Sequence, residues 1–308
     1  MNDRKIRAIF FGTHEFAATI LEGLISSPFI TVELVITQPD KPVGRKKELK
    51  KSPVKILAEK YDLPIIQPAS LRIYQLPISD YHIAIVAQYG IIIPKKLLDD
   101  SPHGFLNVHT SLLPKYRGAS PIQSALINGE TETGVTIMKM DEGLDTGPII
   151  LQKPIKIGEH DTYIDLDKKL AEIGKIALLE AIPKYISGEL EPIPQDNLQA
   201  STCGQFTRDD GKIDWTKSAT DIYNRYRGLN PWPGIWTSWK NKRLKLIKIK
   251  PVDLQIEAGK VVLENGKMYI GCAKNAIEVL KLQLEGKKAM DVEGFLRGYQ
   301  KIASNILN

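Results

Sequence analysis

The segment Arg7-Ala8-Ile9-Phe10-Phe11-Gly12-Thr13 decides the fold of this chain. Its apolar run predicts a buried strand, Gly12 predicts a turn, and Thr13 can cap a following helix. Residues 16–25 then have helical spacing, and residues 32–37 form a second apolar run. A strand, a helix and a strand in this order form a βαβ unit, whose two strands lie parallel in one sheet.

The same alternation continues through the first two-thirds of the chain. Further strands are predicted at residues 82–87, 104–109 and 135–140, and further helices at 52–61, 121–128 and 161–181. Thr162 and Asp165 have a spacing close to that of a capping box, at the start of the last of these helices. Strands that alternate with helices predict an α/β fold, with a Rossmann-like, mostly parallel sheet and helices on both faces.

The pattern changes after a polar segment that contains Pro183, Gly188, Pro192 and Pro194. We predict one domain at residues 1–189, a linker at 190–208 and a second domain at 209–308. In the second domain we expect helices at 218–228 and 291–299, with strands at 235–239, 243–250, 260–263, 268–272 and 277–284. Several short strands in about 100 residues predict a small β-barrel of the oligonucleotide-binding type.

Composition and missing motifs exclude several classes of protein. The chain is 43% hydrophobic and 25% charged, which is typical of a soluble globular protein. No apolar run approaches the roughly 20 residues of a membrane helix, and no room precedes the first strand for a signal sequence. Cys203 and Cys272 are too isolated for a disulfide framework or a zinc site. Dinucleotide, phosphate-loop and metalloprotease motifs are missing as well. We therefore expect a cytoplasmic protein without a metal.

The positive charge is concentrated in the last third of the chain. Residues 1–208 hold 24 Lys and Arg against 25 Asp and Glu, whereas residues 209–308 hold 18 against 11. This excess of +7 suggests a polyanionic partner, with a charged surface kept for solubility as the alternative.

Asn107 and His109 lie in Leu106-Asn107-Val108-His109-Thr110-Ser111-Leu112-Leu113-Pro114, where a predicted buried strand ends. Because they are two residues apart, their side chains point to the same face of a strand. Open α/β sheets build their sites at this end of the strands. An amide that can bind an oxyanion and an imidazole that can carry a proton are the groups that acyl transfer needs. The alternative is a core Asn and His satisfied by the backbone, which the apolar flank and the following turn disfavour.

Asp145 follows the strand predicted at residues 135–140, in Asp141-Glu142-Gly143-Leu144-Asp145-Thr146-Gly147. An Asp in a glycine-rich turn is usually only part of the turn, and an aspartic protease would need a second such motif. If the sheet brings Asp145 near His109, the carboxylate would orient that imidazole.

Two basic segments are candidate contacts for a nucleic acid. Residues 41–51 form a glycine-containing basic loop, and residues 240–250 include six basic side chains. Each segment alone is typical of a solvated face, but on an enzyme-like core the two together suggest phosphate contacts. The candidate residues are Arg45, Lys46, Lys47, Lys242, Arg243 and Lys245.

At these residues the chain resembles the methionyl-tRNA formyltransferases, within the formyltetrahydrofolate-dependent formyltransferase family. The resemblance covers nearly the whole chain, at residues 11–13, 16–17, 37–45, 52–55, 89–90, 94, 107–109, 111–114, 117–123, 132–136, 145–147, 211–215, 230–233 and 286–289. The Asn-x-His, Ser-Leu-Leu-Pro and Asp-Thr-Gly set resembles the family as a group, whereas the basic loop and the last domain resemble the tRNA enzymes. One departure is His14-Glu15, where this family usually has Pro-Asp.

The resemblance implies formyl transfer from 10-formyltetrahydrofolate to the α-amino group of methionyl initiator tRNA, for the initiation of translation. It implies catalytic roles for Asn107, His109 and Asp145. It implies tRNA contacts by Arg45 and the last domain, and a folate pocket lined by Ser111, Leu112, Leu113 and Pro114. We expect a monomer that contacts no membrane.

Two alternatives remain open at this point. A formyltransferase for a small amine, such as an amino sugar nucleotide or glycinamide ribonucleotide, would share the features of residues 1–208, although a small acceptor needs no basic domain. A non-catalytic RNA-binding protein on an inactive enzyme scaffold would not need Asn107, His109 and Asp145 to be intact.

Overall fold

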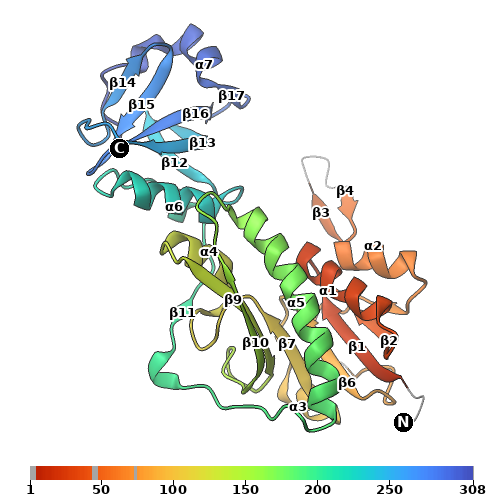
Figure 1. Ribbon diagram of the computed structural model, residues 1–308. Helices are drawn as coiled ribbons and strands as arrows, with labels where there is room; N and C mark the ends of the chain where they lie inside the picture. Colours follow the sequence, from red (N-terminus) through yellow and green to blue (C-terminus); the bar gives the residue numbers. More distant parts are fainter. Residues whose placement is uncertain (1–4, 44–47, 73–74, 308) are drawn as a thin grey trace. The chain divides into compact units, whose positions relative to one another are not determined.

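A computed structural model describes residues 5–43, 48–72 and 75–307 (Figure 1). The described chain folds as two compact units. The first consists of the residues up to Gly118 together with Glu132–Lys156 and Asp167–Thr202, and the second of Ala119–Thr131, Ile157–Leu166 and the residues from Cys203 onward. The predicted boundaries at 1–189, 190–208 and 209–308 stay a prediction.

The first unit contains a seven-stranded sheet in the order β10-β9-β7-β6-β1-β2-β5. The strands are β1 (Ile6–Gly12), β2 (Ile30–Ile36), β5 (Ile65–Ile66), β6 (Ile83–Ala87), β7 (Phe105–His109), β9 (Glu132–Lys139) and β10 (Ile149–Lys156). Five neighbouring strands, from β5 to β7, run parallel, whereas β9 is antiparallel to both β7 and β10. The prediction of a mostly parallel sheet is therefore confirmed.

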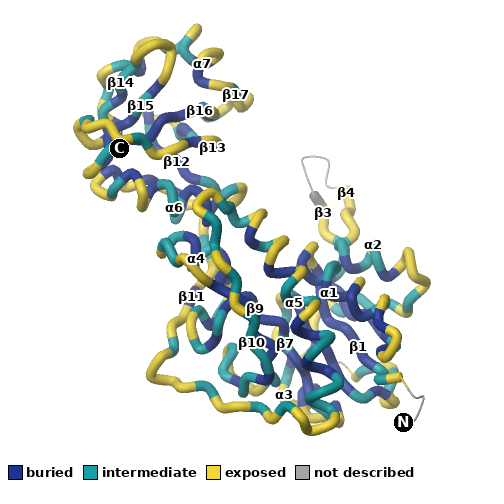
Figure 2. The backbone as a smooth tube through the Cα atoms, in the orientation of Figure 1, coloured by how far each residue is buried: buried dark blue, intermediate teal, exposed yellow. Residues whose placement is uncertain are grey.

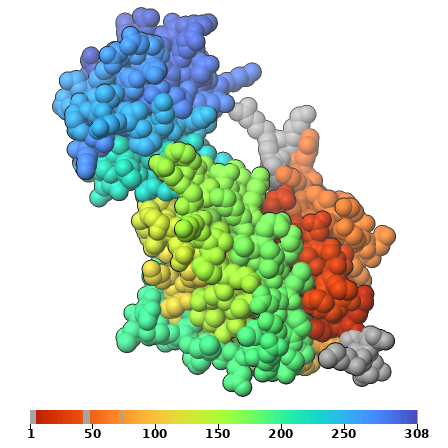
Figure 3. All heavy atoms as spheres, viewed as in Figure 1, coloured from red at the N-terminus to blue at the C-terminus, as the bar shows by residue number. Residues whose placement is uncertain are grey.

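Helices cover both faces of this sheet, namely α1 (Glu15–Ser26), α2 (Pro53–Lys60), α3 (Lys95–Asp99) and α5 (Tyr163–Ile186). Leu97 of α3 packs in one core cluster with Ile9 and Phe11 of β1. On α5, Gly174 lies directly against Val108 of β7, so α5 covers the opposite face. The central strands are accordingly dark blue, or buried, in Figure 2. The outer side of α5 lies on the surface of the first unit (Figure 3).

The helix ends follow the sequence with two exceptions. Ser52 caps α2 by accepting from the Lys55 amide at 3.1 Å, and Asp165 Oδ2 accepts from the amide and hydroxyl of Thr162, at 3.0 and 2.6 Å, before α5. The sequence predicts that Thr13 caps α1, but its hydroxyl donates to Tyr89 O at 3.1 Å instead. Helix α5 also passes through Pro183 rather than ending at residue 181. The residues just before Pro183 are buried in the core, and their packing outweighs the one backbone hydrogen bond that a proline removes from a helix.

The second unit is built on an antiparallel sheet in the order β12-β13-β16-β15-β14, with β17 paired to β16. Its strands are β12 (Ile235–Trp239), β13 (Lys242–Val252), β14 (Val261–Glu264), β15 (Lys267–Gly271), β16 (Ala276–Leu284) and β17 (Met290–Asp291). Its helices are α4 (Pro121–Ile127), α6 (Ala219–Leu229) and α7 (Val292–Tyr299). The sequence predicts a small β-barrel of the oligonucleotide-binding type here, and the structure has an antiparallel sheet domain after the mostly parallel sheet, in agreement with the predicted fold class.

Two short pieces from the first two-thirds of the chain belong to this second unit. Helix α4 packs on α6, where Gly228 lies close to the Ile127 side chain. Arg227 of α6 donates to Gly158 O at 3.1 Å and to Asp161 O at 3.3 Å, so it holds the turn before α5. None of the described helices is long and apolar enough to span a bilayer.

Candidate active site

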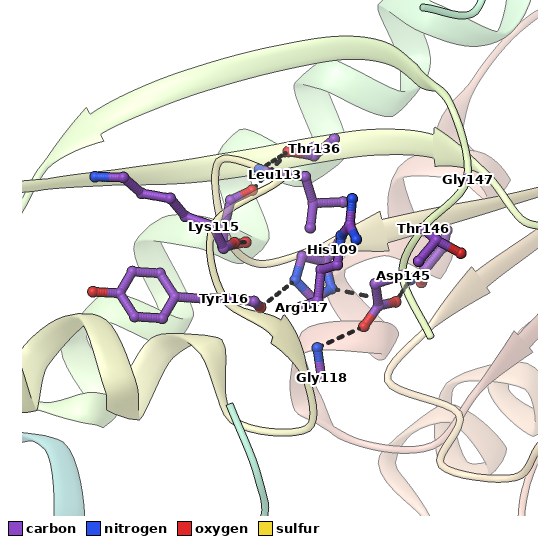
Figure 4. A network of polar contacts seen from close by, with 12 residues as sticks. His109, Leu113, Lys115, Tyr116, Arg117, Gly118, Thr136, Asp145, Thr146 and Gly147 are labelled. Carbon is purple, nitrogen blue, oxygen red and sulfur yellow. Dashed lines mark hydrogen bonds and ion pairs between the residues drawn. The ribbon is translucent and has the colours of Figure 1, made fainter. Parts of the chain in front are cut away.

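The structure brings the three predicted catalytic side chains together. Figure 4 shows two of them, His109 and Asp145, side by side. Asn107 and His109 lie in the C-terminal half of β7, and Asp145 lies in the loop between β9 and β10. Strand β9 ends beside Leu106 of β7, and the loop after it folds back so that Asp145 reaches the Asn107 and His109 side chains. The sequence could not show this arrangement, because it depends on the fold of that loop.

The Asp145 carboxylate lies between Asn107 and His109. Its Oδ1 is 3.4 Å from Asn107 Nδ2 and 3.7 Å from His109 Nδ1. Its Oδ2 accepts a hydrogen bond of 2.8 Å from the Gly118 amide. The side chains of His109 and Asp145 are only 6% and 15% exposed. The carboxylate therefore has partners on both oxygens and little access to water.

The contact between Nε2 of the His109 ring and a carbonyl oxygen indicates which ring nitrogen carries a hydrogen. Nε2 is 3.0 Å from Tyr116 O, and a carbonyl oxygen can only accept. Nε2 therefore carries a hydrogen in this arrangement, and Nδ1 faces Asp145. To act directly on a substrate, Nε2 must exchange its bond to Tyr116 for one to the substrate.

The segment predicted to line a folate pocket is held by its own backbone network. Ser111 is fully buried, and its hydroxyl donates to Lys115 O at 2.6 Å. The Thr136 hydroxyl donates to Ser111 O at 2.7 Å and accepts from the Leu113 amide at 3.1 Å. Leu112 and the cis-bonded Pro114 are the half-buried members of the segment. The role of Ser111, Leu112, Leu113 and Pro114 stays a prediction.

The candidate tRNA-binding residues fall into two groups. Arg45, Lys46 and Lys47 lie outside the described residues, between the hairpin strands β3 (Lys41–Val43) and β4 (Glu48–Lys50). Lys242, Arg243 and Lys245 all lie on β13 of the second unit. Lys242 is exposed, and the Arg243 guanidinium lies 4.2 Å from the centroid of the Trp236 ring. Their contacts with RNA stay predictions.

A polar cluster that the sequence did not reveal holds the base of the β3–β4 hairpin. Lys55 Nζ is 2.7 Å from Asp40 Oδ2 and 2.8 Å from Gln67 Oε1, and Gln67 Nε2 donates to Asp40 Oδ1 at 2.8 Å. The hydrogen bond from Lys55 is the main cause that lowers the pKa of the Asp40 carboxyl. The basic loop therefore starts from a fixed base.

The two cysteines are not joined in a disulfide. Cys203 and Cys272 are both buried, and burial raises the pKa of the Cys272 thiol to about 12. Among residues 5–43, 48–72 and 75–307, no cluster of three or more His, Cys, Asp or Glu side chains could hold a metal ion.

Sequence reasoning also missed several residues that hold segments of the candidate site in place. Thr136 and Gln152 tie the 111–114 segment to β9 and β10, with Gln152 Nε2 2.8 Å from Leu113 O. Arg117 and Gln195 contact each other beside the Asp145 loop. Gln195 gave no signal, because it stands in a segment whose composition is typical of a linker.

Both the N-terminal and the C-terminal parts of the chain match known protein families. Residues 4–182 match the model for formyl transferase, and residues 205–300 match that for the formyl transferase C-terminal domain. The chain belongs to the formyl transferase family. This confirms the resemblance that the sequence motifs indicated.

Individual relatives span almost the entire chain. A protein named methionyl-tRNA formyltransferase from Caldicellulosiruptor saccharolyticus is 42% identical over 310 residues, which covers 97% of this chain and 99% of the relative. One with the same name from Thermodesulfovibrio yellowstonii is 43% identical and covers 94% and 95%. A crystal structure of an N-formyltransferase from Helicobacter canadensis, in complex with folinic acid and dTDP-3-aminofucose, has a TM-score of 0.67 over 89% of this chain and 98% of its own. At 22% identity, the last likeness shows the fold alone.

Proposed function

We propose that this chain transfers the formyl group of 10-formyltetrahydrofolate to the α-amino group of methionine on initiator tRNA, for the initiation of translation. The observation that carries the proposal is the likeness, along nearly the full chain, to proteins named methionyl-tRNA formyltransferase. It includes the C-terminal domain, at residues 205–300, where the excess of positive charge lies. The grouping of Asn107, His109 and Asp145 supplies the chemistry.

In the reaction, the amine nitrogen attacks the formyl carbon and the carbonyl oxygen becomes an oxyanion. The carbon–nitrogen bond to the folate then breaks, and a proton lost by the amine ends on the folate nitrogen. Asn107 Nδ2 has two hydrogens, one of which faces Asp145 at 3.4 Å, so the other can stabilise the oxyanion. We assign the proton transfer to His109 and the orientation of its ring to Asp145.

The donor substrate would lie against the 111–114 segment. Two hydrogen bonds to Thr136 fix this segment, so its shape is set before a ligand arrives. Leu112 and Pro114 offer apolar surface, which suits the flat faces of a pterin ring. The Ser111 hydroxyl is bonded to Lys115 O, so we assign Ser111 to holding the segment rather than to a direct contact.

The acceptor would be bound mainly through its phosphates. Lys242, Arg243 and Lys245 follow one another along β13, and within the described part of the chain none of the three forms an ion pair. Together with the excess of +7 over residues 209–308, this favours a polyanionic ligand. Because initiator tRNA is used where proteins are made, we also infer a cytoplasmic location, and we expect the protein to act as a monomer.

The experiment supplies 10-formyltetrahydrofolate and follows formylation of methionyl initiator tRNA, methionyl elongator tRNA and free methionine in parallel, with an amino sugar nucleotide as a fourth acceptor. We expect formylation of the initiator tRNA. Turnover with the amino sugar nucleotide alone would replace the proposal by the small-amine alternative. Folate binding without turnover on any acceptor would contradict the assignment of the three side chains.

A further inference from the structure

The side-chain amide of Gln195 joins the segment after α5 to the Asp145 loop. Its Nε2 donates to Asp145 O at 2.9 Å and to Gly147 O at 2.7 Å. Its Oε1 accepts from Arg117 Nε at 3.0 Å and from Arg117 Nη2 at 2.8 Å. These four bonds use both hydrogens and both lone pairs of the amide, so its capacity is fully used.

The orientation of this amide follows from its partners. A guanidinium can only donate and a carbonyl oxygen can only accept, so Oε1 has to face Arg117 and Nε2 has to face the loop. Arg117 is 7% exposed, and its Nη2 also donates to Asn197 Oδ1 at 2.9 Å. Arg117 is thus held in place and in turn fixes which way Gln195 points.

The loop that Gln195 holds has an unfavourable backbone conformation. Asp145 has a φ of +54°, in the left-handed region that a side chain disfavours. Gly147 is packed so closely that a Cβ there would lie 1.9 Å from Lys139 O. A turn of this shape needs support from its surroundings, and Gln195 bonds the carbonyl oxygens at both of its ends.

We propose that Gln195 is a positioning residue for formyl transfer, which holds the turn from Asp145 to Gly147 so that the Asp145 carboxylate lies between Asn107 and His109. The inference rests on the proposed function for its reaction. It assigns a role in the active site to a segment whose sequence resembles a linker.

The three residues before Ala119 support the same arrangement from the other side. Tyr116 O contacts His109, Arg117 orients Gln195, and the Gly118 amide binds the Asp145 carboxylate. This segment is itself bonded to the chain beyond Gln195, since the amides of Tyr116 and Arg117 donate to Ser201 Oγ and Ser201 O at 2.9 and 2.8 Å. The support of Asp145 by Gln195 is therefore part of a connected network.

The test replaces the donor half of the amide and keeps the acceptor half. In Gln195→Glu an oxygen replaces Nε2 and faces two carbonyl oxygens, while the bonds from Arg117 become an ion pair that holds the segment in place. We expect kcat to fall about 10²-fold, the loss typical of a misplacement of about 1 Å in a reacting group. KM for both substrates should change little. Leu198→Ser, on an exposed side chain of the same segment, is the control and should behave as wild type.

A double-mutant cycle with Asp145→Asn separates positioning from a general structural effect. If Gln195 acts through the Asp145 carboxylate, Gln195→Glu should lower the rate in the Asp145→Asn background by less than about threefold. An undiminished loss in that background, a wild-type kcat in Gln195→Glu, or a change confined to KM would each overturn the inference. If Gln195→Glu does not fold, Gln195→Asn, which is one methylene shorter, enters the same cycle.

The proposed function is judged separately, from the wild-type protein alone. Wild type is first assayed with methionyl initiator tRNA and with an amino sugar nucleotide, and the acceptor that it formylates decides the proposed function. The cycle is then measured with that acceptor, so its result on Gln195 does not depend on which acceptor it is.

Discussion

The backbone amide of Gly118 donates a 2.8 Å hydrogen bond to Asp145 Oδ2, while the other carboxylate oxygen faces Asn107 and His109. Two segments far apart in the sequence, one at Gly118 and one at Gln195, thus define the position of one carboxylate. The Gly118 amide holds the carboxylate, and Gln195 holds the backbone that carries it. The charge that faces His109 is consequently fixed in space before a substrate binds.

Removing that charge should slow the reaction. Asp145→Asn keeps an acceptor for the Gly118 amide but no longer presents an anion to His109. We expect kcat to fall by at least about 10²-fold, within the range that general acid–base groups contribute, with thermal unfolding close to that of wild type. Single-turnover formylation of methionyl initiator tRNA measures this. Activity at the wild-type level would remove Asp145 from the catalytic set.

Asn107→Ala tests the oxyanion donor. Deleting one such donor lowers kcat by about 10²–10³-fold, because the developing charge loses a preorganised hydrogen bond. Substrate binding should change less than kcat, since the donor acts mainly in the transition state. Asn265→Gly, in the turn between β14 and β15, serves as the control on another asparagine. A kcat for Asn107→Ala within about tenfold of wild type would contradict the assignment.

Much of the fold could be predicted from the sequence because its elements have strong local signals. The strand at Ile235–Trp239 was predicted at its observed bounds, and the helix at Pro53–Lys60 is set by Ser52 and Pro53. Strand β10 was missed because Pro154 interrupts its pattern, and its pairing with β9 supplies the partners that the local sequence does not indicate.

The sequence indicated the candidate site but not the residues that hold it in place. The alternation of Asn107 and His109 on one strand singled them out, and both lie on β7, whereas their catalytic roles stay a prediction. The closeness of Asp145 depends on the loop after β9 folding back toward β7, which no local pattern indicates. Gln195 and Arg117 act through tertiary hydrogen bonds between distant segments, so only the structure reveals them.

Gly147 should not tolerate a side chain. A Cβ at this position would lie 1.9 Å from Lys139 O, so the turn has to move away from β9. We expect Gly147→Ala to lower both kcat, by about 10²-fold, and the melting temperature, because the carboxylate of Asp145 moves with the turn. Gly204→Ala, where the new methyl group has no neighbour within 4 Å, is the matched control and should retain both. A fully active Gly147→Ala protein would show that the turn can relax without moving Asp145.

Stability should depend on pH through Asp167 of α5. Burial is the main cause that raises the pKa of this carboxyl above 3.8, although a hydrogen bond from Gln88 opposes the shift. The folded protein therefore holds this proton more tightly than the unfolded chain, so the stabilisation is present at low pH and is lost as the pH rises through the folded pKa. Asp167→Asn, which is uncharged at every pH, should raise the melting temperature at pH 7, and the difference should shrink as the pH falls toward about 4.

Asp40→Asn is the control for this prediction, because it should change the melting temperature at pH 7 in the opposite direction. The bond from Lys55 lowers the pKa of the Asp40 carboxyl, so the stabilisation by Asp40 is present above the unfolded pKa and is lost in acid. This substitution should lower the melting temperature at pH 7, with a difference that persists to about pH 4 and shrinks only as the pH falls further, through the lowered folded pKa. Thermal unfolding of the three proteins across this range measures both effects. An Asp167→Asn protein that is less stable than wild type at pH 7 would show that the bond from Gln88 outweighs the burial of the charge.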